Sequence, residues 1–269
     1  MGILNVTPDS FSDGALYSTP ASAVRHALQM ITDGADIIDI GGESTRPGSD
    51  PVTAGEELKR VIPVIEGILG ENPESILSID TYKAEVAREA LCRGVRIVND
   101  ISALRFDLDM PSVVGSYDAT VILMHMKGEP KNMQDNPGYE NVLKTVKDFL
   151  RERTEFARNH GIEQIIIDPG IGFGKRLQDN LEILKSLGTL KEIGYPVLIG
   201  PSRKSFIGKL LQTGVDERLE GSLTAAVAGF LHGASVLRVH DVAATKRALQ
   251  VAHAVSLGAA YSEQGNWLP

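Results

Sequence analysis

The chain has 269 residues, of which 42% are hydrophobic and 23% charged, a globular composition that excludes a disordered chain or a fibrous repeat. Lysine and arginine number 27 against 35 aspartates and glutamates, and the net charge of −8 disfavours broad binding to nucleic acid or anionic membranes. The single cysteine, Cys92, indicates a reducing compartment. The first residues lack the pattern of a signal peptide, and the longest apolar stretch, Leu223–Leu237, is too short to span a bilayer. We therefore expect a cytoplasmic protein.

Short runs rich in isoleucine and valine recur along the chain, and most lack polar alternation, which is typical of strands covered on both faces. They are Gly2–Val6, Asp36–Ile40, Ile76–Asp80, Arg96–Asn99, Thr120–Met124, Gln164–Asp168, Pro196–Gly200 and Ser235–Val239.

Longer segments between these runs space their apolar residues three and four apart, which predicts helices. They are Ala21–Gly34, Ala54–Leu69, Lys83–Arg93, Val142–His160, Leu177–Leu187 and Ala243–Leu257, with a less periodic helix near Met110–Gly115. Eight strand-and-helix units in this length predict an α/β fold, a closed (β/α)₈ barrel over residues 1–269 as one domain. An open, doubly wound sheet is the alternative.

Each predicted strand delivers a polar residue to its carboxyl end, where the chemistry of such barrels takes place. These residues are Asn5, Asp39, Glu43, Asp80, Asn99, Asp100, His125, Asp168, Ser202, Arg203, Lys204, Arg238 and His240. A single such residue is more often a helix cap or turn former, but a full ring of them predicts a site. The cations follow strands two, seven and eight, and their clustering in an acidic chain indicates a local anion site, with a surface salt-bridge network as the alternative.

Other catalytic signatures are absent. Gly170–Gly174 lacks the spacing of a dinucleotide loop, Gly174-Lys175 is not part of a P-loop, and Ser202 is not in a nucleophile elbow. The six histidines form no H-x-x-x-H pair, which disfavours a zinc site made by the protein alone. We expect His26, His160, His232 and His253 to be packing or surface residues on helices.

Seven segments in order along the chain together resemble dihydropteroate synthase, a family of pterin-binding barrels. They are Asn5–Gly14, Asp39–Gly48, Ser78–Thr81, Asn99–Ile101, Asp168–Gly174, Ser202–Ser205 and Arg238–His240. The resemblance implies condensation of 6-hydroxymethyl-7,8-dihydropterin pyrophosphate with p-aminobenzoate, with Mg²⁺ present and pyrophosphate leaving before the amine attacks. It also implies a homodimer, through late helices such as Leu219–Leu231 and Ala243–Leu257.

The resemblance also implies roles for individual residues. Asp80, Asn99, Asp168, Lys204, Met124, Ile101, Gly200 and Phe173 would bind the pterin; Asn5, Thr45, Arg238 and His240 the pyrophosphate; and Arg46, Pro47, Phe173 and Ser205 the aminobenzoate. Asp80, Lys204, Arg238, His240, Thr45 and Arg46 would carry catalysis, and Asn5 would ligate Mg²⁺. Loops 9–20 and 44–53 would fold over the aminobenzoate.

Two other functions remain open at this stage. A pterin-binding methyltransferase shares the barrel and the Asp–Asn–Asp set but has no diphosphate leaving group, so the cations after strands seven and eight disfavour it. A non-catalytic pterin-binding paralogue is the second alternative, and it would be expected to have lost some of the charged residues that this sequence keeps.

Overall fold

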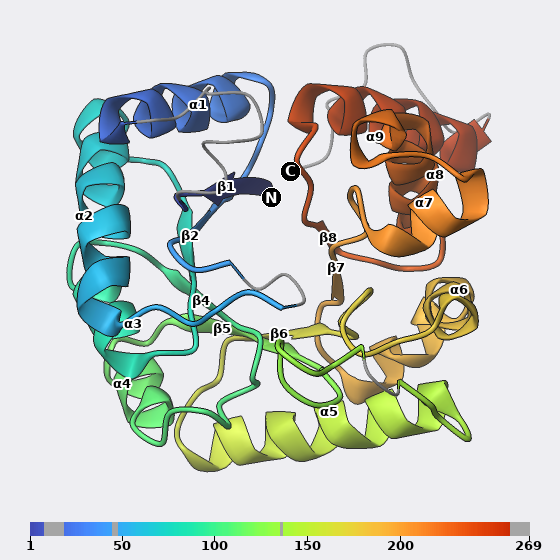
Figure 1. Ribbon diagram of the computed structural model, residues 1–269, viewed down its shortest axis with the longest axis horizontal. Coiled ribbons are helices and arrows are strands. Elements are labelled where there is room, and N and C mark those ends of the chain that lie inside the picture. Colours follow the sequence, from blue (N-terminus) through green and yellow to red (C-terminus); the bar gives the residue numbers. More distant parts are fainter. Residues whose placement is uncertain (8–18, 45–47, 135–136, 259–269) are drawn as a thin grey trace.

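The computed structural model describes residues 1–7, 19–44, 48–134 and 137–258, and eight parallel strands lie at its centre. The strands are β1 (Gly2–Asn5), β2 (Ile38–Gly41), β3 (Leu77–Asp80), β4 (Ile97–Asp100), β5 (Thr120–Met124), β6 (Ile165–Asp168), β7 (Leu198–Ile199) and β8 (Val236–Leu237). The α-helices are α1 (Pro20–Thr32), α2 (Ala54–Glu71), α3 (Ala84–Leu91), α4 (Met110–Ser116), α5 (Val142–Asn159), α6 (Leu177–Lys185), α7 (Ser205–Leu211), α8 (Leu219–Leu231) and α9 (Val242–Leu257). Short 3₁₀ turns lie at Leu187–Thr189, Lys191–Ile193 and Val215–Glu217. The helices surround the strands as an outer ring (Figure 1).

The strands close into a barrel in two steps. Strands β1 to β6 pair in parallel in chain order, and β7 pairs with β8. Single bridges between Ile167 and Val197 and between Gly2 and Val239 then join the two sheets, with hydrogen bonds such as Ile3 N to Val239 O at 3.0 Å. The predicted (β/α)₈ barrel is confirmed, and the open sheet is wrong.

Helix ends follow local sequence signals. Thr19 caps α1 in a reciprocal pair with Ser22 and is followed by Pro20 in the first turn, while Thr53 and Asn141 accept hydrogen bonds from the first turns of α2 and α5. Helix α7 was not predicted, because Ser205–Leu211 is too short to show a helical period. Strands β7 and β8 are shorter than predicted, since Val197 O accepts from both Ser235 N and Val236 N and breaks the regular ladder.

Alternate strand residues point to two different cores. One set packs against the helices and includes Leu4, Ile40, Ile79, Val98, Leu123 and Ile167. The other fills the inside of the barrel near its amino-terminal end, where Met1, Ile97, Ile122 and Leu198 pack with Ile37, Ile166 and Val236. The barrel is therefore a packed core whose period of two decides which side chains reach its interior.

No helix among the described residues is long and apolar enough to cross a membrane. The four histidines expected on helices behave as predicted where contacts are given: His160 lies against Phe156, His232 Nδ1 lies 3.0 Å from Leu184 O, and His253 contacts the Phe230 ring.

The turn after β6 yields a test of backbone geometry. Gly170 has φ +70°, and a Cβ on it would lie 2.0 Å from the carbonyl oxygen of His125. Gly161 has φ +76° with nothing within 4 Å of the same position. We expect Gly161→Ala to lower the free energy of unfolding by about 1 kcal/mol through the left-handed backbone alone. Gly170→Ala should lower it by roughly 1–3 kcal/mol more, because the backbone must move to relieve the overlap. Urea unfolding of the two variants, at a constant m-value, measures both free-energy changes. Equal unfolding midpoints for Gly161→Ala and Gly170→Ala would show that the backbone near Gly170 accommodates a methyl group without added cost.

Candidate functional site

The residues of the site come two positions after the apolar residues that fill the barrel. Ile37, Ile97, Ile122, Ile166, Leu198 and Val236 pack inside the barrel. Asp39, Asn99, Met124, Asp168, Gly200 and Arg238 follow them. Because side chains alternate along a strand, these later residues form the next layer, at the carboxyl end. The barrel therefore ends in a mostly polar layer above an apolar one.

Arg238 lies at the centre of this polar layer. Its Nε donates to Asp39 Oδ2 at 2.5 Å and its terminal nitrogen donates to Asp80 Oδ2 at 2.6 Å, while Asn99 Nδ2 donates to the same Asp39 oxygen at 3.1 Å. One guanidinium thus ties β8 to β2 and β3. Burial favours the neutral form of this side chain, but Asp39 and Asp80 outweigh it and raise the pKa of Arg238 above its ordinary value.

The carboxylates of this layer are not fully satisfied. Asp39 Oδ1 and Asp80 Oδ1 are buried and have no hydrogen-bond partner within the described part of the chain. A buried acceptor left without a donor costs about 1–3 kcal/mol, so such atoms mark a place where a ligand supplies the donor. Burial raises the pKa of Asp80 to about 7 and that of Asp168 to about 6, and Gly170 N opposes the shift in Asp168 by donating to Oδ1 at 2.7 Å.

An apolar wall lies beside the charged groups. Ile101, Met124, Met126 and Met133 form one cluster, against which Tyr82 and Phe173 pack. Lys204 Nζ lies 4.1 Å from the centroid of the Phe173 ring, so a cation covers one face of that ring. Polar groups on one side and flat or flexible apolar groups on the other suit a planar heterocycle with hydrogen-bonding edges.

The remaining predicted residues occupy the rim. Asn5 lies next to Asp80, because a Cβ built on Gly41 would be 3.7 Å from Asn5 Oδ1 and 3.5 Å from Asp80 Cβ. His240 Nδ1 lies 3.0 Å from Ser202 Oγ, and burial together with Arg238 lowers the pKa of His240 to about 3. Ser205 is exposed at the first residue of α7.

The structure modifies the expected cation cluster. Arg203 does not turn toward the other cations: its guanidinium pairs with Asp241 at 2.7 and 3.1 Å. Two of the three guanidinium nitrogens of Arg238 hold Asp39 and Asp80, and no contact of the third with the described residues is seen. Thr45, Arg46 and Pro47, and most of the predicted loop 9–20, lie outside the described residues.

Sequence reasoning missed a second charged network next to the site. Glu43, two residues after β2, accepts from Tyr82, from Lys83 Nζ at 2.6 Å and from Val52 N at 2.9 Å. Lys83 also donates to the buried Glu57 at 2.5 Å. The carboxylate of Glu43 therefore joins both ends of segment 43–52. The charges were visible in the sequence, but their pairing depends on how α2 and α3 pack.

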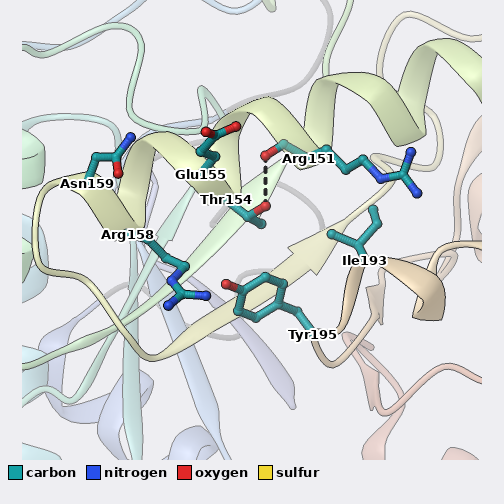
Figure 2. A pocket seen from close by; sticks show the side chains of 7 residues that line it. All are labelled: Arg151, Thr154, Glu155, Arg158, Asn159, Ile193 and Tyr195. Atoms are coloured by element: carbon teal, nitrogen blue, oxygen red, sulfur yellow. Dashed lines mark hydrogen bonds between the residues drawn. The ribbon is translucent and has the colours of Figure 1, made fainter.

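A separate hollow of about 490 Å³ lies outside the barrel, between α5 and the segment before β7 (Figure 2). Its lining is Arg151, Thr154, Glu155, Arg158, Asn159, Ile193 and Tyr195, none of which belongs to the strand-end set. In Figure 2 the Arg158 side chain extends toward Tyr195, and the Arg151 side chain lies on the side of Ile193. This hollow is not part of the candidate site.

Comparison with known proteins agrees with the geometry. The family model of pterin binding enzymes matches residues 1–240. Dihydropteroate synthase of Escherichia coli is 47% identical over 262 residues, covering 94% of this chain and 90% of its own. The chain belongs to the dihydropteroate synthases.

Solved structures give the same answer. The Yersinia pestis synthase, in a sulfonamide drug complex, has a TM-score of 0.92 at 42% identity and covers 96% of this chain and 94% of its own. The Xanthomonas albilineans synthase, with 4-aminobenzoic acid, has a TM-score of 0.89 at 46% identity, with coverage of 96% and 93%. These relatives favour the synthase over the methyltransferase, and the resemblance seen in the sequence is confirmed.

The buried Asp80 predicts a pH-dependent stability. Its pKa of about 7 exceeds the ordinary 3.8, so between these pH values the folded protein keeps a proton that the unfolded chain releases. Stability from this group is present below pH 4 and is lost as the pH rises through 7. Asp80→Asn should remove this loss, so that from pH 4 to 7 the variant gains at least about 1 kcal/mol of unfolding free energy relative to wild type.

Chemical denaturation at several pH values measures this difference. Asp216→Asn changes an exposed aspartate on a 3₁₀ turn and is the matched control. Parallel curves for wild type and Asp80→Asn would contradict the assigned shift.

Proposed function

We propose that this synthase joins 6-hydroxymethyl-7,8-dihydropterin pyrophosphate to p-aminobenzoate, forming 7,8-dihydropteroate and pyrophosphate. The observation that carries the proposal is the layer around Arg238, where buried carboxylate oxygens without partners lie beside cations and an apolar wall. The C–O bond to pyrophosphate breaks and its electron pair leaves with that oxygen. The amine nitrogen then forms the C–N bond and releases a proton.

The pterin ring fits the inner carboxylates. Its adjacent N–H donors match an ionised carboxylate as a bidentate pair, and we assign this contact to Asp168. Burial raises the pKa of Asp168 only to about 6, so the group is mostly ionised at neutral pH. We assign further ring atoms to Asn99 and Asp80, which pair directly in the register of β3 and β4. Ile101, Met124 and Phe173 supply the apolar face, and Gly200 leaves space beside Arg238.

Catalysis in this proposal is electrostatic. As pyrophosphate leaves, positive charge develops on the pterin methylene group, and the ionised form of Asp80 stabilises it. The unpartnered Asp80 Oδ1 is free to face that charge without breaking the contact that its other oxygen makes with Arg238. Lys204 lies over the Phe173 ring. Its positive charge favours the ionised forms of both Asp80 and Asp168.

The leaving group would bind at the rim near Asn5, Arg238 and His240, together with Thr45. The described residues contain no group of three or more acidic, histidine or cysteine side chains that could hold a metal. A magnesium ion that keeps waters and binds phosphate oxygens needs only one or two protein oxygens, and the amide oxygen of Asn5 at the rim fits that need. When bound, Mg²⁺ would offset the negative charge of the pyrophosphate. Asn5 would orient the ion, and Arg238 would bind the phosphate oxygens.

For p-aminobenzoate we assign the outer part of the site. Phe173 would contact its ring and Ser205 its carboxylate, with Arg46 and Pro47 from the segment between β2 and α2. The bound 4-aminobenzoic acid in the Xanthomonas albilineans relative supports this class of second substrate. Arg46 and Thr45 complete the catalytic set of the proposal.

The test of the function is pyrophosphate release coupled to p-aminobenzoate. Wild-type protein with pterin pyrophosphate and Mg²⁺ should release pyrophosphate in proportion to labelled aminobenzoate incorporated. Methyl transfer from methyltetrahydrofolate to a corrinoid protein would support the methyltransferase instead. Pterin binding without either turnover would support a non-catalytic paralogue.

Asp168→Asn tests the pterin contact. It preserves size but replaces a carboxylate oxygen with an N–H₂ donor, which would face the donors of the ring. We expect pterin affinity to fall by about 2–4 kcal/mol, since a buried donor is left unpaired. Calorimetry on the folded variant checks this, and unchanged affinity would place the ring elsewhere.

Arg238→Lys tests the leaving-group contact while keeping a positive charge between Asp39 and Asp80. Lysine cannot make the forked contacts of a guanidinium, each of which contributes roughly 1.5–3 kcal/mol when charge-assisted. We expect at least a tenfold loss of affinity for pterin pyrophosphate and no more than a threefold loss for the pterin alcohol. Equal losses would mean that Arg238 serves the ring alone.

A cytoplasmic homodimer is part of the proposal. The single cysteine, Cys92, is an exposed free thiol, which suits a reducing compartment. Helices α8 and α9 pack together and expose Leu231, Val251 and Val255, the last at 75%. We expect light scattering to show a dimer and the double change Val251→Glu with Val255→Glu to give a folded monomer. A dimer that survives this change would place the interface elsewhere.

A further inference from the structure

Lys175 is a buried lysine directly after the glycine-rich turn that follows β6. The residue is only 4% exposed, and its amine contacts His125 and Phe173 but forms no ion pair with a carboxylate of the described residues. Burial without a paired anion is costly for an ammonium group, and burial lowers the pKa of Lys175 to about 7. A methionine would fill the same space without that cost. The amine therefore needs an explanation other than packing.

The contacts of this amine all join two strand ends. Nζ donates to His125 O at 3.2 Å and to Phe173 O at 3.0 Å, and it lies 3.0 Å from His125 Nδ1. An ammonium has three N–H donors, and these three acceptors use all of them. His125 follows β5, and Phe173 lies in the turn after β6. The amine thus fastens the turn to the neighbouring strand.

The turn needs such an anchor because of its composition. Gly170, Gly172 and Gly174 all have positive φ, and none has a side chain with which to hold the turn in place. It is fixed from behind instead: Asn180 Oδ1 accepts from Gly172 N at 2.7 Å, and the Tyr139 hydroxyl donates to Gly174 O at 2.7 Å. Lys175 supplies the contacts nearest Phe173.

Both ends of the anchored turn carry residues of the proposed site. Asp168 opens it, with Oδ1 accepting from Gly170 N, and Phe173 packs against the apolar cluster under Lys204. The charge of Lys175 also favours the ionised form of Asp168. One amine therefore acts both on Asp168, to which we assign the pterin, and on the segment that carries Phe173.

We propose that Lys175 is a positioning residue, whose amine joins His125 to the Asp168–Gly174 turn and so sets Asp168 and Phe173 for substrate. The inference rests on the proposed function for what those two residues bind. It assigns to the lysine after the glycine-rich turn a role in substrate affinity, not in the bond-breaking step.

Lys175→Met tests this against Lys127→Met. Lys127 is exposed, lies two residues after His125 in the segment that follows β5, and contacts Tyr139 and Gly138, so it is the matched control. At a temperature where both variants are folded, we expect Lys175→Met to raise the pterin Kd and the KM for p-aminobenzoate at least tenfold, with kcat changed less than threefold. Lys127→Met should change each value less than twofold. A lower Tm with unchanged Kd and KM would overturn the proposal.

Two further measurements keep the test informative if Lys175→Met does not fold. His125→Asn keeps a side-chain acceptor for the amine and His125→Leu removes it, so only the leucine variant should weaken pterin binding. An indole introduced by Phe173→Trp, with Trp267→Phe removing the chain's single tryptophan, reports on the turn without any substrate. His125→Leu should raise its acrylamide quenching at least twofold and His125→Asn should not. Equal quenching in both would overturn the proposal, even for a protein that showed no synthase activity.

Discussion

The site depends on one buried cation between two carboxylates. Arg238 extends from the last strand and is bound by Asp39 and Asp80 on the second and third. Without the guanidinium, two carboxylates would stay buried in a barrel whose floor is apolar, at a cost of several kcal/mol. With the guanidinium in place, one oxygen of each carboxylate accepts a hydrogen bond from Arg238, and this contact fixes the orientation of the other oxygen, which has no partner among the described residues. The same contact that stabilises the barrel at its closing strand therefore leaves acceptors ready for a ligand.

Much of this could be predicted from the sequence, for a simple geometric reason. Strands that are covered on both faces appear in the sequence as short aliphatic runs. Because side chains alternate along a strand, a polar residue two positions after an inward-facing apolar residue also points inward. Asp168 and Asn99 were predicted as the last residues of such runs, and the structure shows that they follow the inward-facing Ile166 and Ile97. The sequence patterns of α8 and of the short strands β7 and β8 are weaker. The single bridges that close the barrel correspond to no sequence pattern.

Pairing between charged side chains could not be predicted. Arg203 and Arg238 are both cations near strand ends, yet the first pairs with Asp241 at the surface and the second with buried carboxylates. Helix α5 gives another case: Arg153 donates to the carbonyl oxygens of Ala103 and Leu104, two successive residues with positive φ. That strained turn follows Asn99, and Asp100 caps it through Ser102 N and Leu104 N. Only the packing of α5 reveals why two non-glycine residues hold such a conformation.

These features share a physical logic. The turns that carry Ile101 and Phe173 are both unfavourable by themselves. The first places two residues that have side chains in the left-handed backbone region. The second contains three glycines, which lose much conformational freedom on folding. Each is fixed by a buried cation from outside the pocket, Arg153 for the first and Lys175 for the second, through backbone carbonyl oxygens. In the proposed function, the side of each turn opposite these carbonyl contacts faces the substrate. A barrel that binds a rigid, planar ring can keep its pocket walls in place in this way, with the extensive core between strands and helices offsetting the local cost.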